Sequence, residues 1–274
     1  MAKDNYDDIF EGQQEAVDER REQRQQERGA LFGLADQMAL ELGSPESLTQ
    51  YLDTQARFPT HSVNNALLIM AQMPAATQVR TFDAWKEQGA FVQKGEKSIQ
   101  ILEPGKPFEG DDGKMHTPYN IRRVFDISQT DAKPAPVAGR DGKELLRGLV
   151  YYAPVACVIS DTVPEGKAAH YDGKQILVRR GGDAHGLFRA IATEMAAAKL
   201  GQGFGAQCAA YMLCRQHGVE PPMVGRPPEA FSSGDAQAIR GELDKIHKVA
   251  GDIGNRMQRN LAPPAKTDKA VVPE

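Results

Sequence analysis

The chain has 274 residues, of which 41% are hydrophobic, and a formal net charge of −4. This length is enough for two ordinary hydrophobic cores. The charge excludes a uniformly basic nucleic-acid coat: residues 1–60 carry 6 basic against 13 acidic side chains, residues 61–130 carry 8 of each, and the remainder carries 19 against 16. A nucleic-acid site would have to come from cations clustered on one face, with modest and salt-sensitive affinity.

The first segment, residues 1–43, is predicted to be a charged helical leader. Its first thirty residues are rich in Gln, Glu and Arg and lack an apolar stripe, which indicates a mobile, solvated helix. A better helix is expected near residues 31–42. The pattern thus predicts a leader that contributes little to a core before residue 31.

The second segment, residues 44–132, is predicted to be an α+β module. Ser44 followed by Pro45 has the N-cap and first-turn proline of a helix. Another helix is expected over residues 64–73, and Thr81 can cap a short helix. Strands over residues 99–102 and 121–127, joined through an Asp-Gly turn at 112–113, complete the module.

A linker is predicted over residues 133–141, where prolines and small residues follow one another. Beyond it, residues 142–261 are predicted to form a mainly helical domain with a small sheet. Strands are expected at 155–159 and 175–179, with an Asp-Gly turn at 172–173, and helices at 184–200, 206–216 and 235–261. The Pro- and Lys-containing residues 262–274 are expected to be a disordered tail. The predicted fold class is α+β with two domains.

The stretch from residue 61 to 104 carries the most functional information. It contains the only tryptophan, Trp85, among cations and a short apolar pattern. An aromatic face for bases and cations for phosphates together suit single-stranded nucleic acid. On composition alone, the favoured alternative is that Trp85 is a core residue and the lysines form a solvated face.

Ordered motifs in this part of the chain resemble a known family. They are S-x-N-N-x-L-L-I-x-x-Q-x-P-x-A-T at 62–77, W-K-E-x-G at 85–89, V-x-K-G-E-K-x-I at 92–99, and I-R-R-V-F-D-I-S-Q-T at 121–130. This set resembles the N-terminal domain of the ArdC antirestriction family. The resemblance implies a single-stranded DNA-binding module carried by plasmids and other mobile elements. Ala90 departs from the family pattern, which usually places Arg after the glycine.

The predicted DNA contacts follow from this resemblance and from side-chain chemistry. Cations would bind phosphates, whereas rings and amides would stack on bases or bind their edges. The candidate residues are Asn64, Asn65, Arg80, Trp85, Lys86, Lys94, Lys97, Arg122, Arg123 and Gln129.

The helix predicted at 184–200 resembles the family's metallopeptidase-like helix, in which two histidines flank a glutamate as H-E-x-x-H. Thr193 and Ala197 occupy the two histidine positions here, and only Glu194 remains. A third family ligand, an acidic residue, aligns with Gln207. Because a catalytic zinc keeps three protein ligands, we expect no metal, no cofactor and no hydrolysis at this helix.

Three alternatives remain open from the sequence. His170, His185 and His217 could assemble a different metal site, although they lack paired helical spacing. A hydrolase built around Glu194 is the enzymatic alternative to a DNA-binding protein. The third alternative is a protein-interaction module in which DNA plays no part. Within the DNA-binding hypothesis, a host defence or conjugation protein is a further expected partner.

The cysteines and the apolar segments bear on the cellular compartment. Cys157, Cys208 and Cys214 are odd in number and lack C-x-x-C spacing, which favours a reducing cytoplasm. No basic start precedes an apolar run, and the apolar segments are shorter than the ~20 residues that a membrane helix needs. We therefore expect a cytoplasmic protein without a membrane partner.

Overall fold

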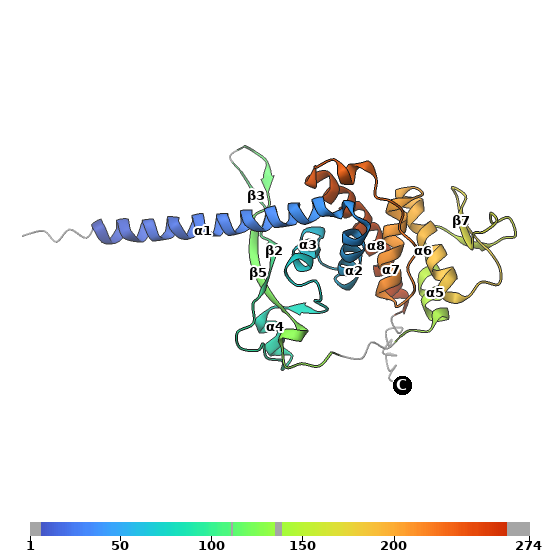
Figure 1. The fold of residues 1–274 in the computed structure, drawn as a ribbon, viewed down its shortest axis with the longest axis horizontal. Helices are drawn as coiled ribbons and strands as arrows, with labels where there is room; N and C mark the ends of the chain where they lie inside the picture. The colour runs from blue at the N-terminus through green and yellow to red at the C-terminus, as the bar shows by residue number, and fades with distance from the viewer. Residues whose placement is uncertain (1–6, 111, 135–138, 262–274) are drawn as a thin grey trace, which may run out of the picture. The chain divides into compact units, whose positions relative to one another are not determined.

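The computed structural model describes residues 7–110, 112–134 and 139–261. The chain folds into two compact units: Met1–Ala135 with Pro227–Gly241, and Pro136–Arg226 with Glu242–Glu274. Helices predominate and the sheets are small, so the predicted α+β class is confirmed (Figure 1). The segment 227–241, which we expected within the second domain, groups with the first unit. The predicted tail 262–274 and linker residues 135–138 lie outside the described residues.

Three of the helices in the first unit begin at side-chain caps. Ser44, Ser62 and Thr81 each accept a hydrogen bond from the backbone nitrogen three residues later, which satisfies one unpaired N–H of the first turn. The predicted helix starts at Ser44 and Thr81 are confirmed. The helices are α1 (Asp7–Leu40), α2 (Pro45–Arg57), α3 (Val63–Gln72) and α4 (Phe82–Glu87), with short 3-10 turns at Glu41–Gly43, Ile127–Gln129 and Glu229–Ser232.

Helix α1 runs without interruption from Asp7 to Leu40. Its buried seam consists of Leu31, Ala35 and Ala39, spaced four residues apart on one face. Leu31 and Ala35 pack with Leu68 of α3 and Leu102. Only the C-terminal part of α1 therefore packs into the core, in the region where the sequence predicted a helix near residues 31–42.

A three-stranded antiparallel sheet holds the first unit together, in the order β1-β5-β2. Its strands are β1 (Val79–Arg80), β2 (Ile99–Pro104) and β5 (Tyr119–Asp126). Ile99 pairs with Val124, and both side chains are buried in a cluster with Ile69 of α3. A separate hairpin of β3 (Phe108–Glu109) and β4 (Met115–His116) connects β2 to β5. The predicted strands at 99–102 and 121–127 are confirmed within a few residues.

Two amide side chains of α3 close the outer edge of β2. Asn65 donates to the backbone oxygen of Leu102 and accepts from its nitrogen, both at 2.9 Å. Gln72, two turns later on the same helix face, bonds the backbone oxygen and nitrogen of Gln100 at 2.8 and 2.9 Å. These bonds replace the neighbouring strand that an edge otherwise lacks.

The second unit combines a small mixed sheet with helices. Its strands are β6 (Cys157–Ile159), β7 (Ala169–Tyr171) and β8 (Ile176–Val178), in the order β6-β8-β7, and the turn predicted at 172–173 joins the antiparallel pair β7 and β8. The helices are α5 (Gly142–Val150), α6 (Ala184–Leu200), α7 (Phe204–Gln216) and α8 (Ala236–Leu261). Helix α5 was not predicted, whereas the bounds predicted for α6, residues 184–200, are confirmed. Over the described ranges, none of the helices combines the length and apolar character needed to span a membrane.

Candidate nucleic-acid interface

Four predicted cations of the first unit are exposed. Lys86 lies on α4, Lys94 and Lys97 lie in the loop before β2, and Arg123 lies on β5. Over the described ranges, none of the four forms an ion pair. Their charges therefore remain available to a polyanion.

The loop that carries Lys94 and Lys97 is held by backbone contacts to the end of the sheet. The backbone nitrogen of Gln93 donates to the oxygen of Gln129 at 2.9 Å, and its side chain donates to the oxygen of Thr130 at 3.1 Å. The side chain of Gln129 in turn donates to the backbone oxygen of Lys97 at 2.8 Å. The two lysines thus extend from a fixed backbone, which lowers the entropy lost when they bind a ligand.

The same contacts correct the role predicted for Gln129. Its side chain is buried, donates to a carboxylate oxygen of Glu96 at 2.8 Å, and accepts from the backbone nitrogen of Asp126 at 2.9 Å. Both ends of the amide are used inside the module, so Gln129 positions the loop and is not placed to read a base.

Trp85 is also inside the module, and the structure contradicts its predicted stacking role. Its side chain is 2% exposed and packs with Ala90 and Ile127. The indole Nε1 donates to the backbone oxygen of Phe125 at 2.8 Å, and the guanidinium of Arg80 lies 5.4 Å from the ring centroid. The alternative that Trp85 is a core residue is therefore correct, and Arg80 covers its ring through a cation–π contact.

The two adjacent asparagines of α3 are likewise engaged. Asn65 is buried, and its amide is used by Leu102 at the edge of β2. Asn64 accepts from Arg240 at 3.1 Å, and Arg240 forms an ion pair of 2.8 Å with Asp36. The DNA contact predicted for Asn65 is therefore wrong, because the side chain is buried and its amide is bonded to the backbone of Leu102.

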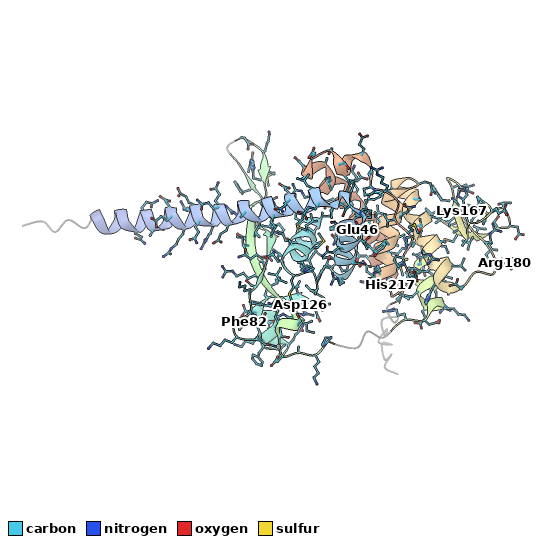
Figure 2. All side chains as sticks on the ribbon, in the orientation of Figure 1. Glu46, Phe82, Asp126, Lys167, Arg180 and His217 are labelled. Atoms are coloured by element: carbon cyan, nitrogen blue, oxygen red, sulfur yellow. The ribbon has the colours of Figure 1, made fainter. Side chains whose placement is uncertain are left out.

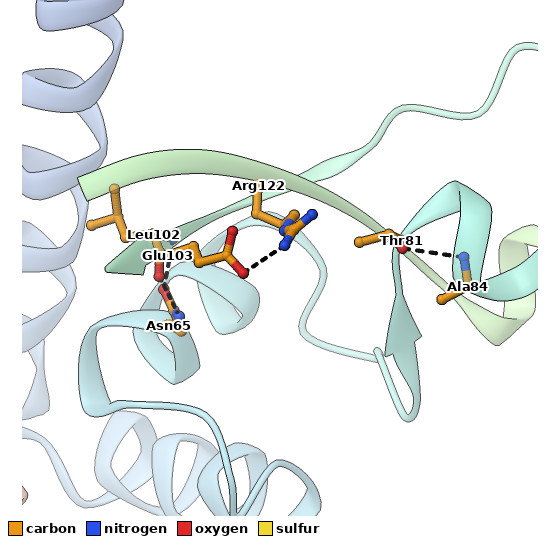
Figure 3. A network of polar contacts seen from close by, with 6 residues as sticks. All are labelled: Asn65, Thr81, Ala84, Leu102, Glu103 and Arg122. Carbon is orange, nitrogen blue, oxygen red and sulfur yellow. Dashed lines mark hydrogen bonds and ion pairs between the residues drawn. The ribbon is translucent and has the colours of Figure 1, made fainter. Parts of the chain in front are cut away.

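Arg122 points from β5 toward a partner on the neighbouring strand. It donates to Glu103 at 2.6 Å, and both side chains are about half exposed (Figure 3). The hydrogen bond and charge of Glu103 raise the pKa of Arg122. Exposed ion pairs of this kind contribute little to stability.

Two exposed aromatic side chains near these cations were not singled out from the sequence. Phe82 is 51% exposed on α4, and Phe91 is 56% exposed in the loop before Lys94. Phe82, which is labelled in Figure 2, meets Phe125 edge to face at 6.5 Å.

In the second unit, Glu194 of α6 is 6% exposed and its carboxylate is used by neighbours. One oxygen accepts from the backbone nitrogen of Tyr171 at 2.9 Å and from the side chain of Gln202 at 2.8 Å. Thr193 donates to a backbone oxygen within α6 at 2.9 Å, and Gln207 accepts from a backbone nitrogen at 2.9 Å. These polar atoms all serve contacts within the unit.

The three histidines of the alternative metal site lie on different elements. His170 is on β7, His185 is exposed at the start of α6, and His217 follows α7. His217 packs against the ring of Phe188 at 5.9 Å, and burial lowers its pKa. Among the residues that the structure describes, no group of three or more His, Cys, Asp or Glu side chains is arranged to hold a metal ion.

Comparisons with known proteins find a family similar to part of the first unit. Residues 41–133 match the family described as the N-terminal domain of anti-restriction factor ArdC. The uncharacterized protein pXO2-81 of Bacillus anthracis is 23% identical over 299 residues, which cover 80% of this chain and 49% of that protein. The chain thus spans about half the length of that curated relative.

Two solved structures are also similar to this chain. The metal-free crystal structure of the antirestriction ArdC protein from the R388 plasmid is 18% identical, with 72% of this chain and 84% of that chain covered and a TM-score of 0.46. The Mn(II)-bound structure of the same protein is 17% identical, with 78% and 98% covered and a TM-score of 0.49.

Proposed function

We propose that the first unit binds single-stranded DNA, and the match of residues 41–133 to the N-terminal domain of anti-restriction factor ArdC supports this proposal. The observation that carries the proposal is the group of exposed cations Lys86, Lys94, Lys97 and Arg123, which form no ion pair over the described ranges. Each such cation that meets a phosphate releases counterions from the strand, which is the main source of affinity in sequence-independent binding.

Base contacts in this proposal come from exposed rings. Phe82 and Phe91 present about half of their surfaces to solvent, whereas Trp85 presents almost none. Stacking on an aromatic side chain is tolerant of base identity, because every base has a π-face. The proposed binding therefore carries little sequence preference, as a protein that protects incoming strands against restriction would need.

We propose further that the second unit is catalytically silent. The R388 protein binds Mn(II) in one of its structures, so the donors that this chain offers at α6 decide whether a metal fits. Ala197 supplies no donor, Thr193 and Gln207 bond backbone groups, and Glu194 holds Tyr171 and Gln202. This set does not fit a catalytic metal, which needs three protein ligands. The antirestriction role that we propose therefore rests on DNA binding, with a host defence or conjugation protein as a further proposed partner.

A titration with a labelled single-stranded oligonucleotide, followed by fluorescence anisotropy at two ionic strengths, tests the DNA proposal. The double variant Lys94→Glu/Lys97→Glu should weaken binding and lower the slope of log K against log[salt] by about 1.4, since each lost contact to a single strand removes about 0.7. The matched control Lys174→Glu/Lys199→Glu makes the same charge change on exposed lysines of the second unit. Equal weakening in both double variants, or none in the first, would reject the proposed face.

A further inference from the structure

A pocket of about 340 Å³ lies between α1 and β5, outside the set of residues predicted from the sequence except for Arg123. Pockets that hold small ligands begin at about this volume. Its walls come from two elements of the first unit and include three guanidinium groups and one carboxylate. The lining residues are Arg24, Glu27, Arg28, Tyr119, Asn120, Ile121 and Arg123.

The spacing of side chains on α1 explains why the pocket forms there. Arg24, Arg28 and Phe32 follow one another at intervals of four and therefore share one helix face. The ring of Phe32 meets Tyr119 edge to face at 5.5 Å, and Arg28 donates to the backbone oxygen of Tyr119 at 3.2 Å. These contacts anchor α1 over β5 and leave Arg24, one turn earlier, exposed at the pocket.

The chemistry of the walls favours a ligand that is anionic at one end and flat at the other. Three arginines against Glu27 leave a net positive charge, and guanidinium groups bind phosphate oxygens in a forked geometry. Tyr119 and Ile121 provide an apolar wall, and the exposed amide of Asn120 offers both a donor and an acceptor. A phosphate joined to a base satisfies both halves of this site.

We propose that this pocket binds one nucleotide unit of the DNA strand, with its phosphate on Arg24 and Arg123 and its base beside Tyr119. The proposal rests on single-stranded DNA binding by the first unit and extends the interface to α1, whose pocket residues precede residues 41–133. Because Arg123 belongs to both sets of contacts, the proposed path of the DNA leads from the cations of the loop to the pocket. The charged leader thus acquires a role as one wall of the binding site.

The test compares Arg24→Ala with Arg21→Ala in the same anisotropy titration at two ionic strengths. Both arginines are exposed on α1, but Arg21 pairs with Asp18 at 3.5 Å and does not line the pocket. Arg24→Ala should weaken binding about threefold or more and lower the salt slope by about 0.7, whereas Arg21→Ala should match the wild-type protein. Glu27→Gln should strengthen binding, because it removes the carboxylate that repels the phosphate.

Opposite results separate this inference from the proposed function. If the wild-type protein binds the oligonucleotide and Arg24→Ala leaves both affinity and slope unchanged, the pocket is not a nucleotide site, although DNA binding stands. Equal losses in Arg24→Ala and Arg21→Ala would also overturn it, since they indicate only the general charge of α1. If the wild-type protein does not bind the oligonucleotide at all, the proposed function itself fails. Backbone amide shifts of Asn120 and Ile121 on addition of the oligonucleotide, absent with inorganic phosphate alone, are the expected NMR signature of base contact.

Discussion

The indole Nε1 of Trp85 donates a hydrogen bond of 2.8 Å to the backbone oxygen of Phe125. This bond joins α4 to β5 across 40 positions of sequence and fixes the short helix that carries Lys86. Trp85, which the sequence offered as a residue for base stacking, therefore has a structural role: it holds in place the helix that carries Lys86.

Substitution of Trp85 should affect stability and spare DNA binding by the folded protein. Trp85→Phe keeps an aromatic ring but removes the indole donor to the oxygen of Phe125, so we expect a loss of about 1 kcal/mol in the free energy of unfolding. Trp85→Ala should lose about 3–5 kcal/mol because it also leaves a cavity. Urea unfolding measures the loss, and anisotropy below the transition measures binding. A large loss of affinity in folded Trp85→Phe would restore the stacking role.

The amide contacts at the edge of β2 lead to a graded prediction. Asn65→Ala leaves two buried backbone groups of Leu102 without partners, which should lower the free energy of unfolding by about 2–4 kcal/mol. Gln72→Ala removes the equivalent pair at Gln100, where the side chain is exposed and water can replace it, so its effect should be smaller. Chemical denaturation of both variants provides the comparison. The reverse order would show that burial does not control the cost.

Acid should destabilise the first unit through Asp126. Burial alone would raise the pKa of this carboxyl, but hydrogen bonds from Ser128, Gln78 and Thr77 outweigh it and hold the pKa below its ordinary value of 3.8. Because the folded pKa is depressed, the stabilisation is complete above about pH 4 and is lost as the pH falls through the folded pKa.

Thermal unfolding of wild type and Asp126→Asn between neutral pH and about pH 3 measures this effect. The wild type should be more stable at neutral pH, and the gap between the two proteins should narrow on acidification. A constant gap would show that the Asp126 carboxylate does not carry the pH dependence.

Metal addition should leave the second unit unchanged. A ligand that binds only the folded state raises the melting temperature, and the stabilisation grows with the logarithm of the ligand concentration relative to its Kd. Zn²⁺ or Mn²⁺ added to the wild-type protein should therefore produce no shift, and the purified protein should contain neither ion in stoichiometric amount. Glu194→Gln should leave DNA binding as it is. A tightly bound divalent ion that is lost in Glu194→Gln would instead favour the hydrolase alternative.

Local sequence signals predicted most helices and strands. Which of the predicted DNA-contacting residues are exposed depends instead on contacts between distant parts of the chain. The caps at Ser44 and Thr81 act within three residues, and the sequence shows them directly. The strand Val79–Arg80 was missed because two residues are too few for an alternating pattern.

The burial of the predicted base-contacting residues depends on distant partners. Asn65 meets Leu102 across 37 positions and Trp85 meets Phe125 across 40, so neither contact is visible in a local motif. The exposure of Lys94 and Lys97 was predictable because lysine side chains lie mostly at the surface, whatever holds the backbone beneath them. Arg24 and Arg28 were missed because only the packing of Phe32 shows which part of the leader reaches the sheet.

The amides of Asn65 and Gln72 also bear on how the protein behaves at high concentration. An open strand edge is a template on which another chain can pair and begin a fibre. Here the groups that such a chain would seek on β2 at Gln100 and Leu102 are already occupied. Loss of either amide would therefore leave backbone groups of β2 free to pair with another chain and promote aggregation, in addition to weakening the fold.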